Sequence, residues 1–222
     1  MPKVTEEYME SKRQMIVDAC YRVCLRKPVE MVTISDVIAE TGMSQGAIYR
    51  YYNGLDEILA AIATKMRADY NIIDKLEEIL SNSKAPIEEL TFQVCDCLAD
   101  VMENHLMDIQ KINFDLGVIA INEPERAAKI MAGIKGAGNL EYLGKNALPR
   151  LIKGSAMLGY KPVASPEEIG QFVSASYSGI EKFCIMSACY GTGGPKMKAE
   201  PKKLFKTLAK SIILLLGGKT DD

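Results

Sequence analysis

The stretch TISDVIAETGMSQGAIYRYY, residues 33–52, predicts two short helices joined by a glycine turn. Thr33 is followed three positions later by Asp36, a capping-box pattern that starts the first helix. Gly42 comes where a residue of left-handed conformation would end that helix. Ser44 then offers an N-cap for a second helix. Two helices with a short glycine-containing turn between them are typical of the helix-turn-helix motif.

The second predicted helix, which runs to about Tyr51, carries small, polar and aromatic side chains but no carboxylate. Gln45 can pair with adenine, Arg50 with guanine or phosphate, and Ala47 can touch a thymine methyl group. Ile48 and Tyr52 are expected to face the core. The alternative is a buried helical hairpin, but such a helix rarely combines Ser, Gln, Gly and Arg. The predicted DNA-contacting residues are Thr33, Ser44, Gln45, Gly46, Ala47, Tyr49, Arg50 and Tyr51.

Residues 12–60 resemble the N-terminal domain of the TetR family of bacterial transcriptional regulators. Four features carry the resemblance, in this order: the apolar segment MIVDACYRVCL, then TISDVIAETGMS, the aromatic run AIYRYY, and DEIL at the start of a long helix. The resemblance covers about the first quarter of the chain. It implies an all-α homodimer that binds a palindromic operator, represses transcription and releases DNA when a small molecule enters the C-terminal domain.

The chain departs from the family pattern at two places. Leu55 stands where family members usually carry a lysine that contacts a phosphate, so one DNA contact is missing. The loop after the first helix has Lys27, Pro28 and Val29 where the family usually has glycine and an aromatic residue. We expect the first departure to weaken DNA binding and the second to reshape the loop.

The charge balance predicts modest electrostatic attraction to DNA. The chain has a formal net charge of −2, and residues 10–52 hold six basic against five acidic residues, a net charge of +1. Only the face that meets DNA needs to be positive, so this balance does not exclude DNA binding. Affinity is therefore expected to depend on placement and dimerisation more than on total charge.

The six cysteines lie in apolar helical stretches and not in the short knuckles that bind metals. Buried, reduced thiols are the expected state, and a redox sensor is the alternative. The N-terminus is charged and shows no signal peptide, and the longest C-terminal apolar run, IILLL, is too short to span a bilayer. A cytoplasmic protein without membrane contact is expected.

Helical spacing continues through the rest of the chain. A stripe of apolar residues from Leu55 to Leu80 predicts one long helix that joins the two domains. Further helices are expected over residues 106–121, 124–135 and 137–158, with a kink or break at Pro149. We therefore predict an all-α fold with two domains. They are a three-helix DNA-binding domain over residues 1–54 and a helical domain for effector binding and dimerisation over 55–222.

The last two predicted helices each carry a wide apolar face. These faces either bury against the preceding helices or meet the same pair from a second subunit in a four-helix bundle. The family resemblance favours the second arrangement. The predicted dimer interface is Phe172, Tyr177, Ile180, Phe183, Leu208, Ile212 and Leu215.

No pattern in the sequence indicates catalysis, a metal site or a cofactor. His105 is the single histidine and lies in no acid–base or metal-ligand pattern. Flexible methionines and aromatic residues suit a pocket for a neutral or cationic apolar effector, although an ordinary helical core would look similar. The candidate effector-binding residues are Met66, Phe92, Met102, Phe114, Tyr142 and Tyr177. The alternative function is a helical small-molecule binding protein that no longer reads DNA.

Overall fold

The computed structural model describes residues 5–189 and 198–220, and within these ranges every regular element is a helix. The chain forms two compact units. Unit 1 comprises residues 1–70 and 111–136, and unit 2 comprises residues 71–110 and 137–222. Unit 1 therefore contains more than the predicted DNA-binding domain 1–54, because later helices pack against it.

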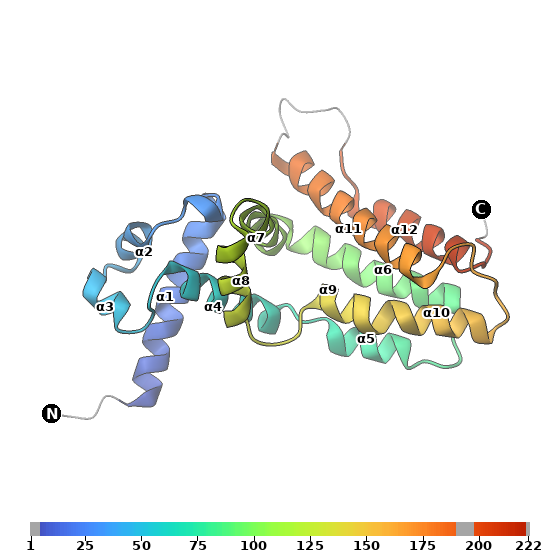
Figure 1. The fold of residues 1–222 in the computed structure, drawn as a ribbon, viewed down its shortest axis with the longest axis horizontal. Coiled ribbons are helices and arrows are strands. Elements are labelled where there is room, and N and C mark those ends of the chain that lie inside the picture. The colour runs from blue at the N-terminus through green and yellow to red at the C-terminus, as the bar shows by residue number, and fades with distance from the viewer. Residues whose placement is uncertain (1–4, 190–197, 221–222) are drawn as a thin grey trace. The chain divides into compact units, whose positions relative to one another are not determined.

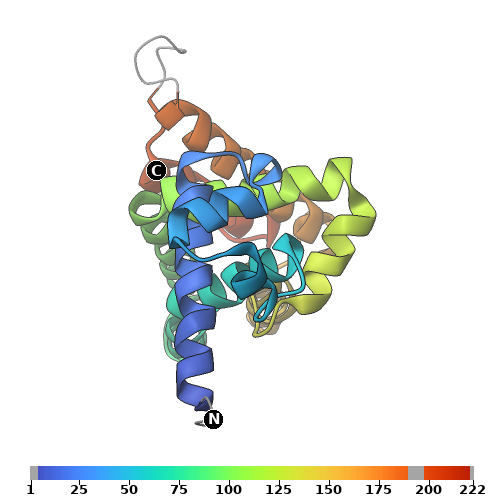
Figure 2. The same cartoon turned by 90° about the vertical axis from the view of Figure 1, so that its left-hand side faces the viewer.

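Unit 1 is built around its longest helix, α1, which contacts both α2 and α4. Figure 2 shows α2 lying across α1. The fully buried residues Ile16 and Cys20 of α1, Ile48 of α3 and Ile58 of α4 form the centre of the unit. The helices of unit 1 are α1 (Glu6–Arg26), η1 (Val29–Met31), α2 (Ile34–Thr41), α3 (Gln45–Tyr49), α4 (Leu55–Asp69), α7 (Lys111–Asn122) and α8 (Pro124–Gly133).

Unit 2 is a helical bundle in which one central helix packs against the C-terminal helix (Figure 1). That central helix, α6 (Ile87–Asn104), is followed by a π-helical turn, η2 (Leu106–Gln110). Its main partner is α12 (Pro201–Leu215), and together they bury Met102 and Phe205 completely. The other elements are α5 (Ile73–Leu80), α9 (Asn139–Tyr142), η3 (Leu143–Ala147), α10 (Leu148–Met157) and α11 (Pro166–Cys189).

The predicted long helix from Leu55 to Leu80 is wrong, because the chain breaks between α4 and α5. The Asn71 side chain accepts a hydrogen bond from the backbone N–H of Ile73 at 2.7 Å. The Asn139 side chain accepts another from the N–H of Ile72 at 3.1 Å. These side chains take N–H groups that a continuous helix would pair with its own carbonyls, and the helix stops there.

Pro149 ends no helix, contrary to the expected kink or break within residues 137–158. It lies at the start of α10, directly after the π-helical turn η3, where the N–H of Leu148 donates to the carbonyl of Leu143. Proline has no N–H and its ring crowds the carbonyl four residues earlier. A wider five-residue turn at this position accommodates the proline within a helical path from α9 to α10.

Five of the six cysteines are buried, as expected, and Cys189 is exposed. Cys95 and Cys97 belong to two different apolar clusters, which agrees with their spacing of two on a helix. Burial raises the pKa of the Cys95 thiol to about 12 and that of Cys184 to about 11. Within the described ranges, no helix combines the length and the apolar character that crossing a membrane requires.

Candidate nucleic-acid interface

The N-terminus of α2 is held by the capping box that the sequence predicts. The Thr33 Oγ accepts a hydrogen bond from the Asp36 N–H, and the Asp36 carboxylate accepts from the Thr33 N–H at 2.8 Å. Lys27 pairs with the same carboxylate at 2.7 Å. Hydrogen bonds from Lys27 and then Thr33 lower the pKa of Asp36 to about 2. Gly42 ends the helix at φ 68°, a left-handed conformation that favours glycine.

The short helix α3 presents most of its side chains to solvent. Its N-cap is Ser44, whose hydroxyl accepts a hydrogen bond from the Ala47 N–H at 3.2 Å. Ile48 is fully buried and anchors the helix, while Tyr49 is 46% exposed. Ser44, Gln45, Gly46 and Arg50 are also exposed, and Ala47 is half-buried. The predicted reading residues on α3 are therefore accessible to a partner molecule, Ala47 less than the others.

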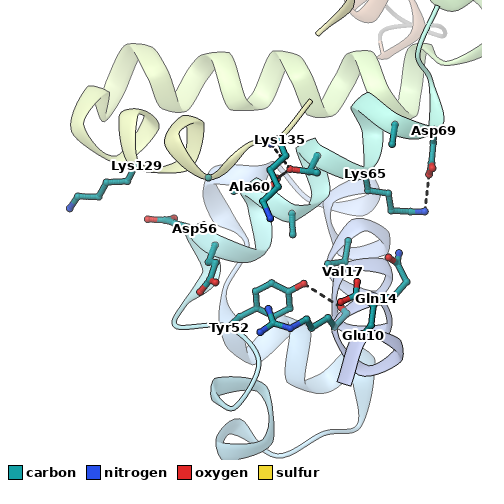
Figure 3. Close-up of a pocket in the computed structure, with 16 residues that line it drawn as sticks. Glu10, Gln14, Val17, Tyr52, Asp56, Ala60, Lys65, Asp69, Lys129 and Lys135 are labelled. Carbon is teal, nitrogen blue, oxygen red and sulfur yellow. Dashed lines mark hydrogen bonds and ion pairs between the residues drawn. The ribbon is translucent and has the colours of Figure 1, made fainter. Parts of the chain in front are cut away.

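Tyr51 corrects the predicted set, because its side chain is only 8% exposed. The helix α3 ends at Tyr49, two residues before the expected end, and the chain then turns inward. The N–H groups of Tyr51 and Tyr52 both donate to the carbonyl of Ile48. Both tyrosines consequently pack into unit 1, where Figure 3 shows the Tyr52 ring between α1 and α4.

The hydroxyls of Thr33 and Ser44 differ in what they can still donate. The Thr33 hydroxyl already gives its one proton to Asp36, at 2.7 Å. A phosphate oxygen can only accept, so Thr33 would have to break this capping bond to contact it. The Ser44 hydroxyl accepts from the Ala47 N–H and its own proton is not used in a described hydrogen bond. Ser44 is thus better suited than Thr33 to contact a phosphate.

Several basic residues near α2 are engaged in ion pairs within unit 1. Glu40 accepts from Arg22 at 2.7 Å and also from Arg26. The Arg22 hydrogen bond, followed by that of Arg26, lowers the pKa of Glu40. With Lys27 bound to Asp36, three of the six basic residues in residues 10–52 have acidic partners. The positive charge that remains for a polyanion is small.

The loop between α1 and α2 is held by two residues of α7 that the sequence did not single out. The Lys111 ammonium donates to the carbonyls of Cys24 and Lys27 at 2.6 and 2.8 Å. The Asp115 carboxylate accepts from the Val29 N–H at 3.1 Å and pairs with Lys111 at 2.7 Å. These side chains are only 16% and 14% exposed. They form a largely buried clamp that fixes the loop before the helix-turn-helix.

A groove of about 700 Å³ runs between α1, α4 and α8 in unit 1 (Figure 3). Its charges are balanced, with four acidic and four basic side chains, and Lys65 pairs with Asp69 at 2.7 Å. Small residues line its base, and a Cβ added at Gly133 would lie 2.9 Å from the Cβ of Ala60. The groove has no charge preference for a ligand, and Gly133 allows α8 to approach α4 closely.

Unit 2 contains a mainly apolar cavity of about 370 Å³ between α6, α9–α10, α11 and α12. Of the six candidate effector-binding residues, Tyr177 lines this cavity and the other five do not. Met66 and Phe114 belong to unit 1, and Met102 is fully buried in the core. Tyr142 is buried and donates its hydroxyl proton to Glu77, and Phe92 lines a separate cavity of about 420 Å³. The predicted set is therefore not one site, because helical periodicity cannot separate core residues from pocket residues.

The predicted dimer residues also divide into two groups. Leu208 and Ile212 of α12 are buried against α6 in their own protomer, and Leu215 packs partly into the same cluster. Leu208 and Ile212 therefore have little surface left for a second subunit, whereas Leu215 is half-buried. The α11 residues differ: Phe172 is 44% exposed, and Tyr177, Ile180 and Phe183 are half-buried.

A capped helix-turn-helix with an exposed second helix, followed by a helical bundle with a cavity, is the arrangement of helix-turn-helix regulators. Residues 16–62 match the family model described as bacterial regulatory proteins, tetR family. The HTH-type transcriptional regulator YfiR of Bacillus subtilis, itself uncharacterised, is 31% identical over 113 residues. This alignment covers 48% of the present chain and 55% of YfiR. PksA of the same organism is 30% identical over 90 residues, which are 40% of this chain and 42% of PksA.

The alignments thus span about half the length of these curated relatives. Two solved structures are similar over 93% of the chain. One is a protein of Mesorhizobium loti that is assigned to the TetR family of transcriptional regulators. Its TM-score is 0.63, its sequence identity is 13%, and 96% of its chain is covered. The other is the fatty acid degradation regulator FadR of Bacillus halodurans, with a TM-score of 0.58, 17% identity and 95% covered. Residues 16–62 thus match the N-terminal domain of the TetR family, and the fold resembles that of a solved structure assigned to this family over 93% of the chain. Members of this family are regulators and not enzymes.

Proposed function

We propose that this protein is a transcriptional regulator that binds a near-palindromic operator as a homodimer and releases it when a small molecule enters unit 2. The observation that carries the proposal is the exposed face of α3, with Gln45, Tyr49 and Arg50 turned to solvent around the buried Ile48. A helix of this kind can enter the major groove and meet base edges. Repression is the usual mode of action in the family.

The base-reading residues in this proposal are Gln45, Ala47, Tyr49 and Arg50, and Ser44 contacts a phosphate. Gly46 is exposed and lets the backbone of α3 approach the DNA closely. Tyr51 has no part in it because it is buried. Chromosomal DNA as the target would place the protein's action in the cytoplasm.

The outer face of α11 supports the homodimer. Only Ile169, Cys184 and Ile185 are buried among the 24 residues of this helix. Its opposite face carries apolar and small residues at helical spacing, and we name these the α11 outer face: Phe172, Ala175, Gly179, Phe183 and Met186. Phe172 and Met186 are 44% and 42% exposed. A second copy across a two-fold axis would cover this face with the same residues. It would also set two α3 helices about one DNA turn, ~34–36 Å, or a multiple of it apart.

Ligand control follows from thermodynamic linkage. A molecule that binds the 370 Å³ cavity more tightly when the two α3 helices are out of register with DNA must weaken DNA binding. The coupling is reciprocal, so bound DNA weakens the binding of the molecule by the same factor. Such couplings are typically about 1–3 kcal/mol. Gln110, the last residue of unit 2 before α7, receives a hydrogen bond from the cavity residue Tyr177. Lys111, the next residue along the chain, belongs to the clamp that fixes the loop before α2.

Selection from a random pool of duplex DNA tests the proposal directly. The expected result is an enriched sequence with two inverted half-sites, bound by two copies of the full chain at moderate salt. Absence of any enriched sequence would contradict the proposal. Together with retained small-molecule binding, that outcome would favour the alternative of a binding protein that no longer reads DNA. Two observations support this alternative. Arg22 and Arg26 are both paired with Glu40, and Leu55 stands where the family usually has a lysine.

Arg50→Ala is expected to weaken binding to the selected operator by about 1–3 kcal/mol, because one bidentate base contact is lost. The exposed position of Arg50 leaves folding unchanged. Fluorescence anisotropy with the operator and with a scrambled duplex measures the effect. Arg50→Lys is the matched control, because it keeps the charge and loses the fork-shaped pair of donors. If both variants bind the operator as tightly as the original protein, Arg50 is not a reading residue.

A further inference from the structure

Glu181 on α11 faces the interior of unit 2. On a helix of 3.6 residues per turn it shares a face with Tyr177. Viewed along the helix axis, its direction falls between those of Cys184 and Ile185, which are both buried. The same face of α11 lines the apolar cavity one turn earlier, through Ser174, Tyr177 and Ser178. The face that α11 presents to solvent, Phe172 to Met186, lies on the opposite side of the helix. Glu181 thus lies one helical turn beyond Tyr177, the cavity residue, toward the C-terminal end of α11.

No described cation pairs with the Glu181 carboxylate. Burial raises its pKa to about 7, and no charged neighbour among the described residues contributes to the shift. In the elements packed against α11, most charged groups have other partners or face solvent. His105, the C-cap of α6, is bonded to Asp108 of η2, Arg150 of α10 to Glu77, Lys202 of α12 to Asp100 and Lys203 to Glu200. Lys153 of α10 and Lys206 of α12 are exposed, and Lys210 of α12 is half-buried.

The surroundings of Glu181 suit a positively charged organic group. Tyr177, which borders it on α11, lies edge-on to the fully buried Phe205 with ring centroids 5.9 Å apart. The Tyr177 hydroxyl donates to Gln110, a buried polar residue of η2, at 3.4 Å. Aromatic faces attract cations, and an ammonium group would supply the countercharge that no described residue gives to the carboxylate. A cavity of about 370 Å³ is large enough for a small organic molecule.

We propose that the effector of this protein is a cationic apolar molecule, such as a quaternary ammonium or protonated amine, whose charge binds at Glu181 and whose apolar part fills the cavity lined by Tyr177. This inference rests on the proposed ligand-controlled regulator and names the chemical class of its ligand. The same arrangement disfavours an anionic effector, because it would face a carboxylate for which no described residue supplies a countercharge.

A comparison of two isosteric probes with two variants tests this assignment on the full chain. The probes are benzyltrimethylammonium and its uncharged isostere neopentylbenzene, and calorimetric titration at pH 8 gives their Kd values. Glu181→Gln keeps the shape of the side chain and removes its charge. It is expected to raise the Kd of the cation at least about tenfold and to change that of the neutral probe less than about threefold. The control Glu167→Gln, at an exposed position of the same helix, should change neither.

The pH dependence of the cation's affinity is a second readout. A purely structural role of Glu181 would not change it. Because the cation needs an ionised carboxylate, its affinity for the original protein should increase by about tenfold per pH unit below pH 7 and level off above it. In Glu181→Gln the affinity should be independent of pH. Thermal denaturation of both variants establishes that they are folded.

Three outcomes would overturn the assignment: no binding of the cation at millimolar concentration, equal loss for both probes in Glu181→Gln, or the same pH dependence with and without Glu181. None of these measurements contains DNA. The operator selection described above contains no ligand. Failure of the ligand assignment is therefore distinguishable from failure of the proposed DNA-binding function.

Discussion

Replacing Asp115 with alanine is expected to lower the free energy of unfolding by about 3 kcal/mol. Asp115 is only 14% exposed, and it neutralises Lys111 and accepts the Val29 N–H. Its removal leaves a largely buried ammonium without a countercharge and a backbone donor without a partner. Urea denaturation followed by circular dichroism measures the change. Operator affinity should fall in the same variant, because the clamp fixes the loop that precedes α2.

Asp69→Ala is the matched control for this experiment. Asp69 also lies four residues after a lysine on one helix and pairs with Lys65 at the same 2.7 Å, but its side chain is 43% exposed. Exposed pairs of this spacing contribute about 0.2–0.5 kcal/mol, so this variant should be nearly as stable as the original protein. Asp115→Asn keeps an acceptor for the Val29 N–H and should fall between the two. Equal losses for Asp115→Ala and Asp69→Ala would show that burial of the clamp has no energetic consequence.

Phe183→Glu is expected to convert the proposed dimer into monomers and to weaken operator binding by about 100-fold or more. Phe183 belongs to the α11 outer face, which we propose meets the same face of a second copy. A carboxylate there would be desolvated near its symmetry mate, and binding of one half-site would no longer assist the other. Light scattering gives the mass of the species in solution, and a mobility shift with the selected operator gives the affinity.

Glu167→Lys is the control for that variant, because Glu167 is exposed on the same helix and lies outside the α11 outer face. It should remain dimeric. Ile212→Glu, by contrast, would not test the interface, because Ile212 is buried against α6 and the charge would unfold unit 2. A Phe183→Glu protein that is still a stable dimer would place the interface elsewhere.

The local chemistry of residues 33–52 could be predicted from the sequence because its causes lie within a few residues. The bond between Thr33 and Asp36, the left-handed turn at Gly42 and the cap at Ser44 all join positions at most four apart. The buried Ile48 and the exposed Arg50 follow from the same short helix. The family resemblance, the all-α fold and the candidate DNA-reading face were therefore accessible without a structure.

Other features depend on residues far apart in the chain, and only the tertiary structure decided them. The break between α4 and α5 uses Asn139, which is 67 positions after Ile72, and the Val29 loop is held by Asp115, 86 positions away. Periodicity showed that α12 has an apolar face, and the three-dimensional packing places the buried part of that face against α6 of the same chain. The burial of Tyr51 and the inward position of Glu181 likewise depend on distant elements of the chain. A sequence pattern tells which side of a helix is apolar, whereas burial and pairing depend on which distant element lies against it.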